Sequence, residues 1–216
     1  MKPVWTRYFI ATLLGACLAG PAWAVGAFTE AALAAARHAF PDQAFDERNI
    51  VRGELNHDGL QDFAVLTDGP ALDGVDERPL RIVVFLGKKD GGFQAPIVSG
   101  DTFRHPAVDQ ELKVMRHSLF LTRSVSGVGS ETFQFSMKGG VFVLVGEETN
   151  FIRSKGFAVD DEQYGDSINF LTHVVISWRI NRKIRKESRK TFLPSPPIKL
   201  QDFDYLDHLK LRGLLQ

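Results

Sequence analysis

The 216-residue chain contains a single cysteine and no excess of charge of either sign. One cysteine, Cys17, excludes both an internal disulfide framework and a cysteine-based zinc site. The 26 Lys and Arg residues balance the 26 Asp and Glu residues, so the chain lacks the basic excess expected of a nucleic-acid-binding protein. The apolar fraction of 44% is enough for one core but too small for a protein with several membrane spans.

The first 24 residues have the pattern of a secretory signal peptide. Lys2 and Arg7 form a basic start, an apolar stretch follows, and Ala22 and Ala24 are the small residues that signal peptidase requires. We therefore expect cleavage after Ala24, export to the periplasm and a single mature domain over residues 25–216. An outer-membrane lipoprotein acylated at Cys17 is the alternative, because Leu-Gly-Ala-Cys precedes the predicted cleavage site.

The mature chain shows signals of strands and turns, with one short helix predicted over residues 29–39. Apolar or alternating runs cover residues 63–66, 80–86, 132–137, 141–145, 167–171 and 174–178. Gly139 and Gly140 predict a hairpin turn between two of them. We expect an all-β domain, either a small sandwich or an open barrel, with one N-terminal helix.

Charge is distributed unevenly along this domain. Residues 42–90 contain eleven acidic and six basic side chains, whereas residues 179–190 contain seven basic side chains and only one acidic side chain, Glu187. The basic run is typical of a solvated edge strand, where Lys and Arg prevent edge-to-edge pairing. Alternatively it provides a surface for an acidic partner or an anionic envelope.

One loop in the acidic part carries the spacing of a calcium site. Oxygen-bearing side chains alternate at Glu54, Asn56 and Asp58, Leu60 can offer its carbonyl oxygen, and Asp62 can close the shell. Gly59 permits the sharp turn that brings such ligands to one hard cation. His57 is expected to face solvent, since calcium prefers oxygen. The alternative is an ordinary turn that joins two strands and binds no ion.

The surrounding sequence resembles a single repeat of the FG-GAP or VCBS type. The matching segments are GELNHDGLQDFAV (residues 53–65), VFLG (84–87) and DGGFQAP (90–96), within a repeat-like stretch at 51–97. The resemblance implies a propeller-blade-like unit with Ca²⁺ in its acidic loop. No second copy follows, so a complete propeller is not expected.

A second resemblance lies in the C-terminal half. SGVGSETFQF (residues 126–135), GVFVLVG (140–146) and SINFLT (167–172) resemble small periplasmic proteins of Gram-negative bacteria, some of which are similar to lysozyme inhibitors and immunity proteins. The resemblance implies that a Ser-Gly loop here, with Ser126, Gly127 and Gly129, enters the cleft of a cell-wall hydrolase. The alternative is a glycine-rich hairpin connection without such a role.

No catalytic signature emerges from the sequence. Ser124 and Ser126 do not form a nucleophile elbow, and the six histidines show no pair at metal-ligand spacing. We therefore expect an exported, non-enzymatic calcium-binding protein that inhibits a peptidoglycan hydrolase. An adhesion or surface-interaction module of the FG-GAP or VCBS type is the alternative.

Overall fold

The computed structural model describes residues 22–43, 45, 47–69, 80–102, 108–153, 162–181 and 183–212. Most of the predicted signal peptide, including Cys17, lies outside the described residues. In chain order the elements are α1 (Ala22–Ala39), η1 (Glu47–Asn49), β1 (Ile50–Gly53), β2 (Asp62–Asp68), β3 (Leu80–Phe85), β4 (Ile97–Val98), β5 (Asp109–Met115), β6 (Ser118–Val125), β7 (Gly129–Lys138), β8 (Val141–Arg153), β9 (Glu162–Asn169), β10 (Val174–Asn181), β11 (Ile184–Thr191), η2 (Leu200–Asp202) and α2 (Tyr205–Leu211).

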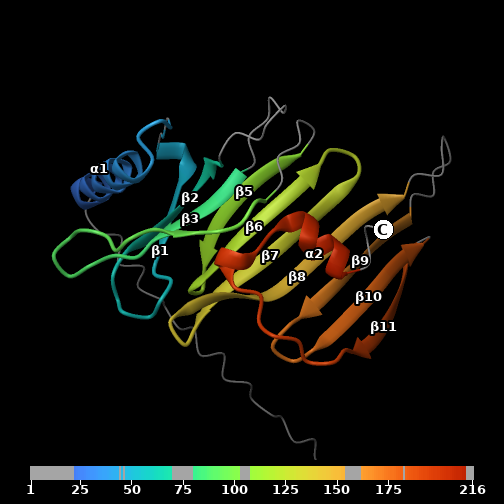
Figure 1. Cartoon of the computed structure of the whole chain (residues 1–216). Coiled ribbons are helices and arrows are strands. Elements are labelled where there is room, and N and C mark those ends of the chain that lie inside the picture. Colours follow the sequence, from blue (N-terminus) through green and yellow to red (C-terminus); the bar gives the residue numbers. More distant parts are fainter. Residues whose placement is uncertain are drawn as a thin grey trace, which may run out of the picture.

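The strands form two antiparallel sheets in which neighbours along the chain pair with each other (Figure 1). The smaller sheet has the order β1-β2-β3-β4, and the larger has the order β11-β10-β9-β8-β7-β6-β5. Neither sheet closes into a barrel, and the all-β prediction is confirmed. The predicted hairpin turn is also present, with Gly139 and Gly140 at φ of 57° and 81°.

The predicted N-terminal helix is present but is longer than expected. α1 begins at Ala22 rather than near Thr29, so Ala24 lies in its first turn. The second helix, α2, was not predicted. Its signal was in the sequence, because Asp204 caps the helix by accepting a hydrogen bond from the backbone N–H of Asp207 at 3.0 Å. No described helix combines the length and the apolar character needed to cross a membrane.

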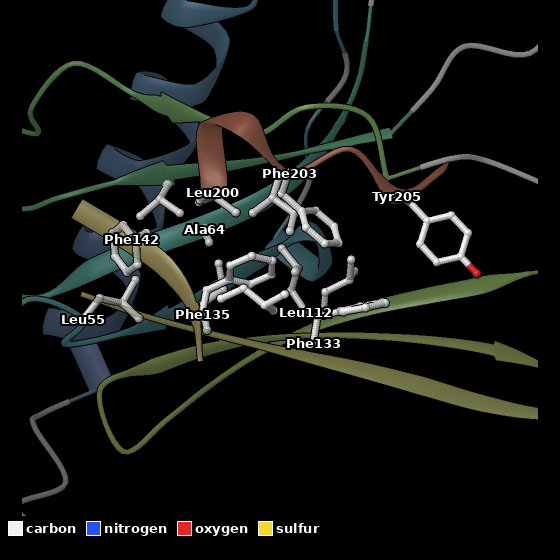
Figure 2. Packing of buried hydrophobic residues seen from close by; sticks show 14 of the residues in the cluster. Leu55, Ala64, Leu112, Phe133, Phe135, Phe142, Leu200, Phe203 and Tyr205 are labelled. Carbon is white, nitrogen blue, oxygen red and sulfur yellow. The ribbon is translucent and has the colours of Figure 1, made fainter. Parts of the chain in front are cut away.

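The main core lies where the two sheets face each other (Figure 2). Alternate residues of β2 and β3, among them Ala64 and Val84, pack against Phe133 and Phe135 of β7. Leu200 and Phe203, which precede α2, complete this cluster, and both are fully buried. The chain therefore returns after its last strand to fill the space between the sheets.

A second core covers the opposite face of the smaller sheet. Phe63 and Phe85 stack at 4.4 Å between ring centroids and are covered by the Ala32 and Ala36 side of α1. Phe93 packs edge-on against Phe63 at 4.7 Å. Both faces of β2 and β3 are covered, in agreement with the unbroken apolar runs at 63–66 and 82–85 in these strands.

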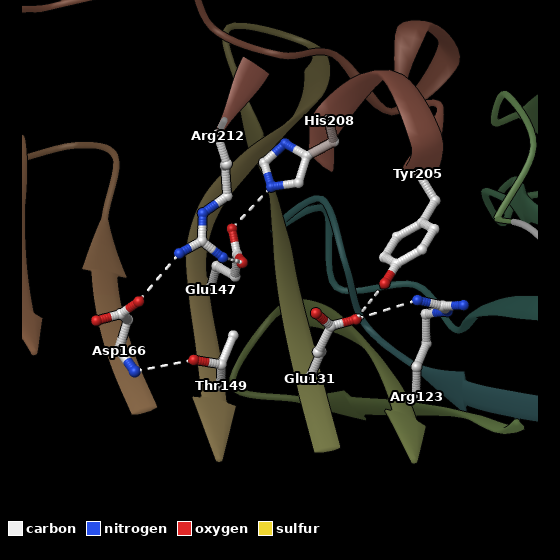
Figure 3. Close-up of polar contacts among 8 residues, drawn as sticks. All are labelled: Arg123, Glu131, Glu147, Thr149, Asp166, Tyr205, His208 and Arg212. Carbon is white, nitrogen blue, oxygen red and sulfur yellow. Dashed lines mark hydrogen bonds and ion pairs between the residues drawn. The ribbon is translucent and has the colours of Figure 1, made fainter. Parts of the chain in front are cut away.

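Two buried carboxylates attach α2 to the larger sheet (Figure 3). Glu147 accepts from the ring nitrogen Nε2 of His208 at 2.8 Å and also pairs with Arg212. Glu131 accepts hydrogen bonds from the Tyr205 hydroxyl at 2.7 Å and from Arg123 at 3.1 Å. Each buried carboxylate thus has partners that offset the cost of removing it from water.

Candidate functional site

The predicted calcium loop connects β1 to β2, and its last residue fixes it to the sheet. The Asp62 side chain is fully buried, and its two oxygens accept the backbone N–H groups of Leu55 at 2.7 Å and Gly87 at 2.8 Å. Asp62 therefore joins both ends of the loop to the end of β3. This contact explains why an acidic residue is buried at the start of β2.

The pKa of Asp62 is raised above its ordinary value of 3.8. Burial is the largest cause, the two backbone hydrogen bonds oppose it, and the negative charges of Asp58 and Glu54 add to it. The loop therefore concentrates negative charge where water cannot screen it well. A cation close to these carboxylates would favour the charged form of Asp62.

At the exposed tip of the loop, Asn56 and Asp58 bond to each other and to the backbone. The Asn56 side-chain amide donates to Asp58 Oδ2 at 2.9 Å, and the backbone N–H of Leu60 donates to Asp58 Oδ1 at 2.8 Å. Gly59 has a φ of 79°, in agreement with the sharp turn expected there. The oxygens of Asn56 and Asp58 are thus gathered at the surface.

Glu54, the first predicted ligand, faces a different neighbour. Its Oε2 lies 2.5 Å from Nδ1 of His117, which belongs to the turn between β5 and β6. Its Oε1 is buried and has no hydrogen-bond partner among the described residues. Glu54 therefore combines one paired oxygen with one buried oxygen that no group in the described part of the chain satisfies. Sequence spacing missed His117 because it is 63 residues from Glu54 along the chain.

The second predicted site, with Ser126, Gly127 and Gly129, is the tight turn between β6 and β7. Gly127 has a φ of 73° and is exposed, and neighbouring Val128 is 48% exposed. Gly129 has a φ of 150°, and a Cβ there would collide with the carbonyl of Asn150 and with Phe151. Gly129 is thus required by the backbone, whereas the tip of the turn is available for contact.

A cleft lined by aromatic and charged side chains lies next to this turn along the same row of the sheet. Strand register places five residues side by side: Gly129, Phe151, Tyr164, Arg179 and Lys186. The last four line a cavity of about 420 Å³, which Arg212 and Asp166 also line. The predicted turn and the predicted basic run therefore belong to one continuous surface.

The cations along this cleft are held in place by buried or half-buried carboxylates. Glu162 is 6% exposed, and its Oε1 lies 3.2 Å from Nε of Arg179. Arg212 bridges Glu147 and Asp166, the latter at 3.2 Å (Figure 3). The guanidinium carbon of Arg153 lies 5.4 Å from the ring centre of Tyr164. Lys186 on the edge strand β11 is exposed.

Comparison with known proteins adds no assignment to this geometry. No family model, curated protein or solved structure matches the chain. The function therefore has to be argued from the sites themselves.

Proposed function

We propose that the protein is an exported, non-enzymatic binding protein that holds a carboxylate-bearing protein partner, a peptidoglycan hydrolase, against its larger sheet. The observation that carries this proposal is the register that places the Ser126–Gly127 turn beside the cleft of Phe151, Tyr164, Arg179 and Lys186. A protruding turn beside aromatic and cationic side chains can enter a cleft and also bind its rim.

The chemistry of glycan cleavage supports this class of partner. Glycan-cleaving hydrolases work with paired carboxyl groups on either side of the scissile bond. Cations such as Arg179 and Lys186 complement these carboxylates, and Phe151 and Tyr164 offer the aromatic anchors that dominate many protein interfaces. The sequence resemblance to lysozyme inhibitors points to the same partner.

We also propose that Ca²⁺ binds the loop through Glu54, Asn56, Asp58, Leu60 and Asp62. Support comes from the surface oxygens at its tip and from the buried Glu54 Oε1, which has no hydrogen-bond partner among the described residues. The repeat-like stretch 51–97 also coincides closely with the four-stranded meander β1–β4. Bound Ca²⁺ would stabilise an exported domain that has no disulfide after cleavage at Ala24.

Inhibition of peptidoglycan hydrolysis tests the partner. We expect the purified protein to slow the clearing of a peptidoglycan suspension by a lysozyme or a lytic transglycosylase. Lys186→Glu should weaken this inhibition at least tenfold, because it reverses a charge in the cleft. Arg189→Glu is the matched control, since Arg189 is three residues from Lys186 and therefore lies on the opposite face of β11. Undiminished hydrolysis at saturating protein would refute the role.

Thermal unfolding with millimolar CaCl₂ and with excess chelator tests the ion. Calcium at one hundred times its Kd stabilises the folded state by about 2.7 kcal/mol, so chelation should lower Tm by several degrees. Asp58→Ala should remove this response, whereas Asp90→Ala, at an exposed turn outside the loop, should retain it. An unchanged Tm on chelation of the unaltered protein would show that the loop is only a turn.

A further inference from the structure

We propose that Glu54, His57 and His117 form a binding site for a transition-metal ion of the Zn²⁺ class. His57 belongs to the acidic loop between β1 and β2, and His117 belongs to the β5–β6 turn. The stacking of the two sheets brings these turns together, so the site exists only in the folded protein. This inference shares Glu54 with the calcium proposal, whereas His57 and His117 belong to this site alone.

The geometry supports a shared ion. One ligand atom from each of the three side chains lies within 4.8 Å of those of the other two. The centroids of the two imidazole rings lie 4.1 Å apart, and the ring planes are inclined to each other by 33°. Ligand atoms around tetrahedral zinc are roughly 3.3 Å apart, so small side-chain rotations would bring the three into coordination distance.

Glu54 supplies a second reason to expect a cation here. Its Oε1 is buried with no hydrogen-bond partner among the described residues, while its Oε2 already lies against His117. A buried carboxylate oxygen without a partner is costly, and a metal ion held jointly with the imidazoles would satisfy it.

The backbone is shaped to present both histidines. His57 has a φ of 64°, and Arg116 and His117 have φ values of 49° and 58°. Two consecutive residues at positive φ form the two-residue hairpin turn that Asn and Gly usually occupy. Residues with a Cβ are strained there, and such strain is found preferentially at functional sites.

The ligand set selects the type of ion. Two imidazole nitrogens and one carboxylate suit Zn²⁺ and its neighbours, whereas Ca²⁺ prefers oxygen alone. Both histidines also border a cavity of about 290 Å³ that Ser136 and Asn169 line, together with Arg116 and Lys138. A fourth coordination position therefore opens onto a polar space, and its two basic side chains favour an anionic fourth ligand such as hydroxide or a carboxylate.

Calorimetric titration with ZnCl₂ tests the site in the purified protein prepared without a histidine tag. We expect one Zn²⁺ per chain, with His57→Ala and His117→Ala each raising the Kd at least tenfold. Both side chains are exposed, so these variants should fold, which circular dichroism will verify. His38→Ala is the control, because His38 is exposed on α1 and should leave the affinity unchanged. No Zn²⁺ binding, or binding that both histidine variants retain, would overturn the proposal.

Two further measurements separate this site from the calcium loop. CoCl₂ should give a visible absorption band from a coordinated, non-octahedral ion, and His117→Ala should abolish that band. Asp58→Ala should leave Zn²⁺ affinity within twofold, whereas a loss equal to that of His117→Ala would assign the metal to the acidic loop instead. His117→Ala should in turn leave any effect of calcium on Tm intact, so failure of one proposal is distinguishable from failure of the other.

Discussion

The smaller sheet and the far end of the larger sheet are built from similar strands but are used in opposite ways. β2 and β3 are covered on both faces, by α1 on one side and by the larger sheet on the other. β11 pairs with β10 along one edge, and every one of its eight residues is exposed. The first region is held by packing, whereas the second keeps its side chains free to contact another molecule.

This difference explains where polar side chains are tolerated. In the covered region Asp62 is buried only because two backbone N–H groups satisfy its oxygens. In the exposed region Arg179, Lys186 and Glu187 lie along neighbouring strands at little cost, because water solvates them. A binding surface built on the exposed end can therefore change without disturbing the core.

The largest expected effect comes from a cavity in the main core. Phe133→Ala should lower the free energy of unfolding by about 3–5 kcal/mol, since Phe133 is fully buried against Phe203. Ile184→Ala on β11, where the side chain is 63% exposed, should change it by less than about 0.5 kcal/mol. Urea denaturation measures both values, and equal losses would contradict the division between a packed and an exposed region.

Replacing Asp62 tests how much a buried polar contact stabilises the covered region of β2 and β3. Asp62→Ala leaves the N–H groups of Leu55 and Gly87 without their acceptor, at a cost of about 2–4 kcal/mol after the desolvation of the carboxylate is relieved. The measurement is urea denaturation in excess chelator, so that no bound ion contributes. Asp58→Ala under the same conditions should cost less than about 1 kcal/mol, because its hydrogen bonds are exposed.

We expect the protein to lose stability at alkaline pH because of Tyr205. Burial, followed by the hydrogen bond to Glu131, raises the pKa of Tyr205 to about 12, compared with 10.0 in the unfolded chain. The contribution of the neutral Tyr205 side chain to the free energy of unfolding is complete below pH 10. It is lost as the pH rises to 12, and the loss amounts to about 3 kcal/mol. Tyr205→Phe should show a correspondingly smaller fall in unfolding free energy between pH 9 and pH 12. An identical fall in both proteins would show that Tyr205 is not responsible.

The smallest expected effect concerns an ion pair in the exposed region. Arg185 and Glu187 pair at 2.6 Å on β11, and both side chains are 52% exposed. Solvent screening limits such a pair to about 0–1 kcal/mol, so Glu187→Ala should leave the urea midpoint almost unchanged. A loss above 1 kcal/mol would mean that the edge hairpin contributes to stability.

Periodicity predicted the strands that bury one or both faces, and it failed where burial depends on distant partners. The predicted strand at 141–145 continues in β8 to Arg153, where it pairs with β7 and β9, and the charged Glu147 within this extension is buried against His208 of α2 and Arg212 at its C-terminal end. β5 alternates polar and apolar residues too weakly to be recognised, since only Leu112 is buried. The basic run at 179–190 was predicted as an edge strand; its residues 184–190 lie in β11 at the edge of the larger sheet, whereas Arg179 belongs to β10.

The candidate sites show the same difference between contacts close in sequence and contacts made by the fold. The local sequence predicted the turn at Gly59 and the proximity of the Asp58 and Asn56 side chains in one loop, because these residues are close in sequence. No local pattern could place His117 beside Glu54 or Tyr164 beside Arg179, since strand pairing and sheet packing create those contacts. Residues that meet only through the fold are the ones that sequence spacing cannot find.

The segment that closes the core has a consequence for how the chain acquires its structure. Residues 198–205 supply Leu200 and Phe203 to the space between sheets whose strands were synthesised much earlier, and Tyr205 contacts a partner 74 residues away. Contacts of such long range slow folding, because the loop entropy is lost before they form. The two sheets consequently cannot complete their common core until this late segment has been synthesised.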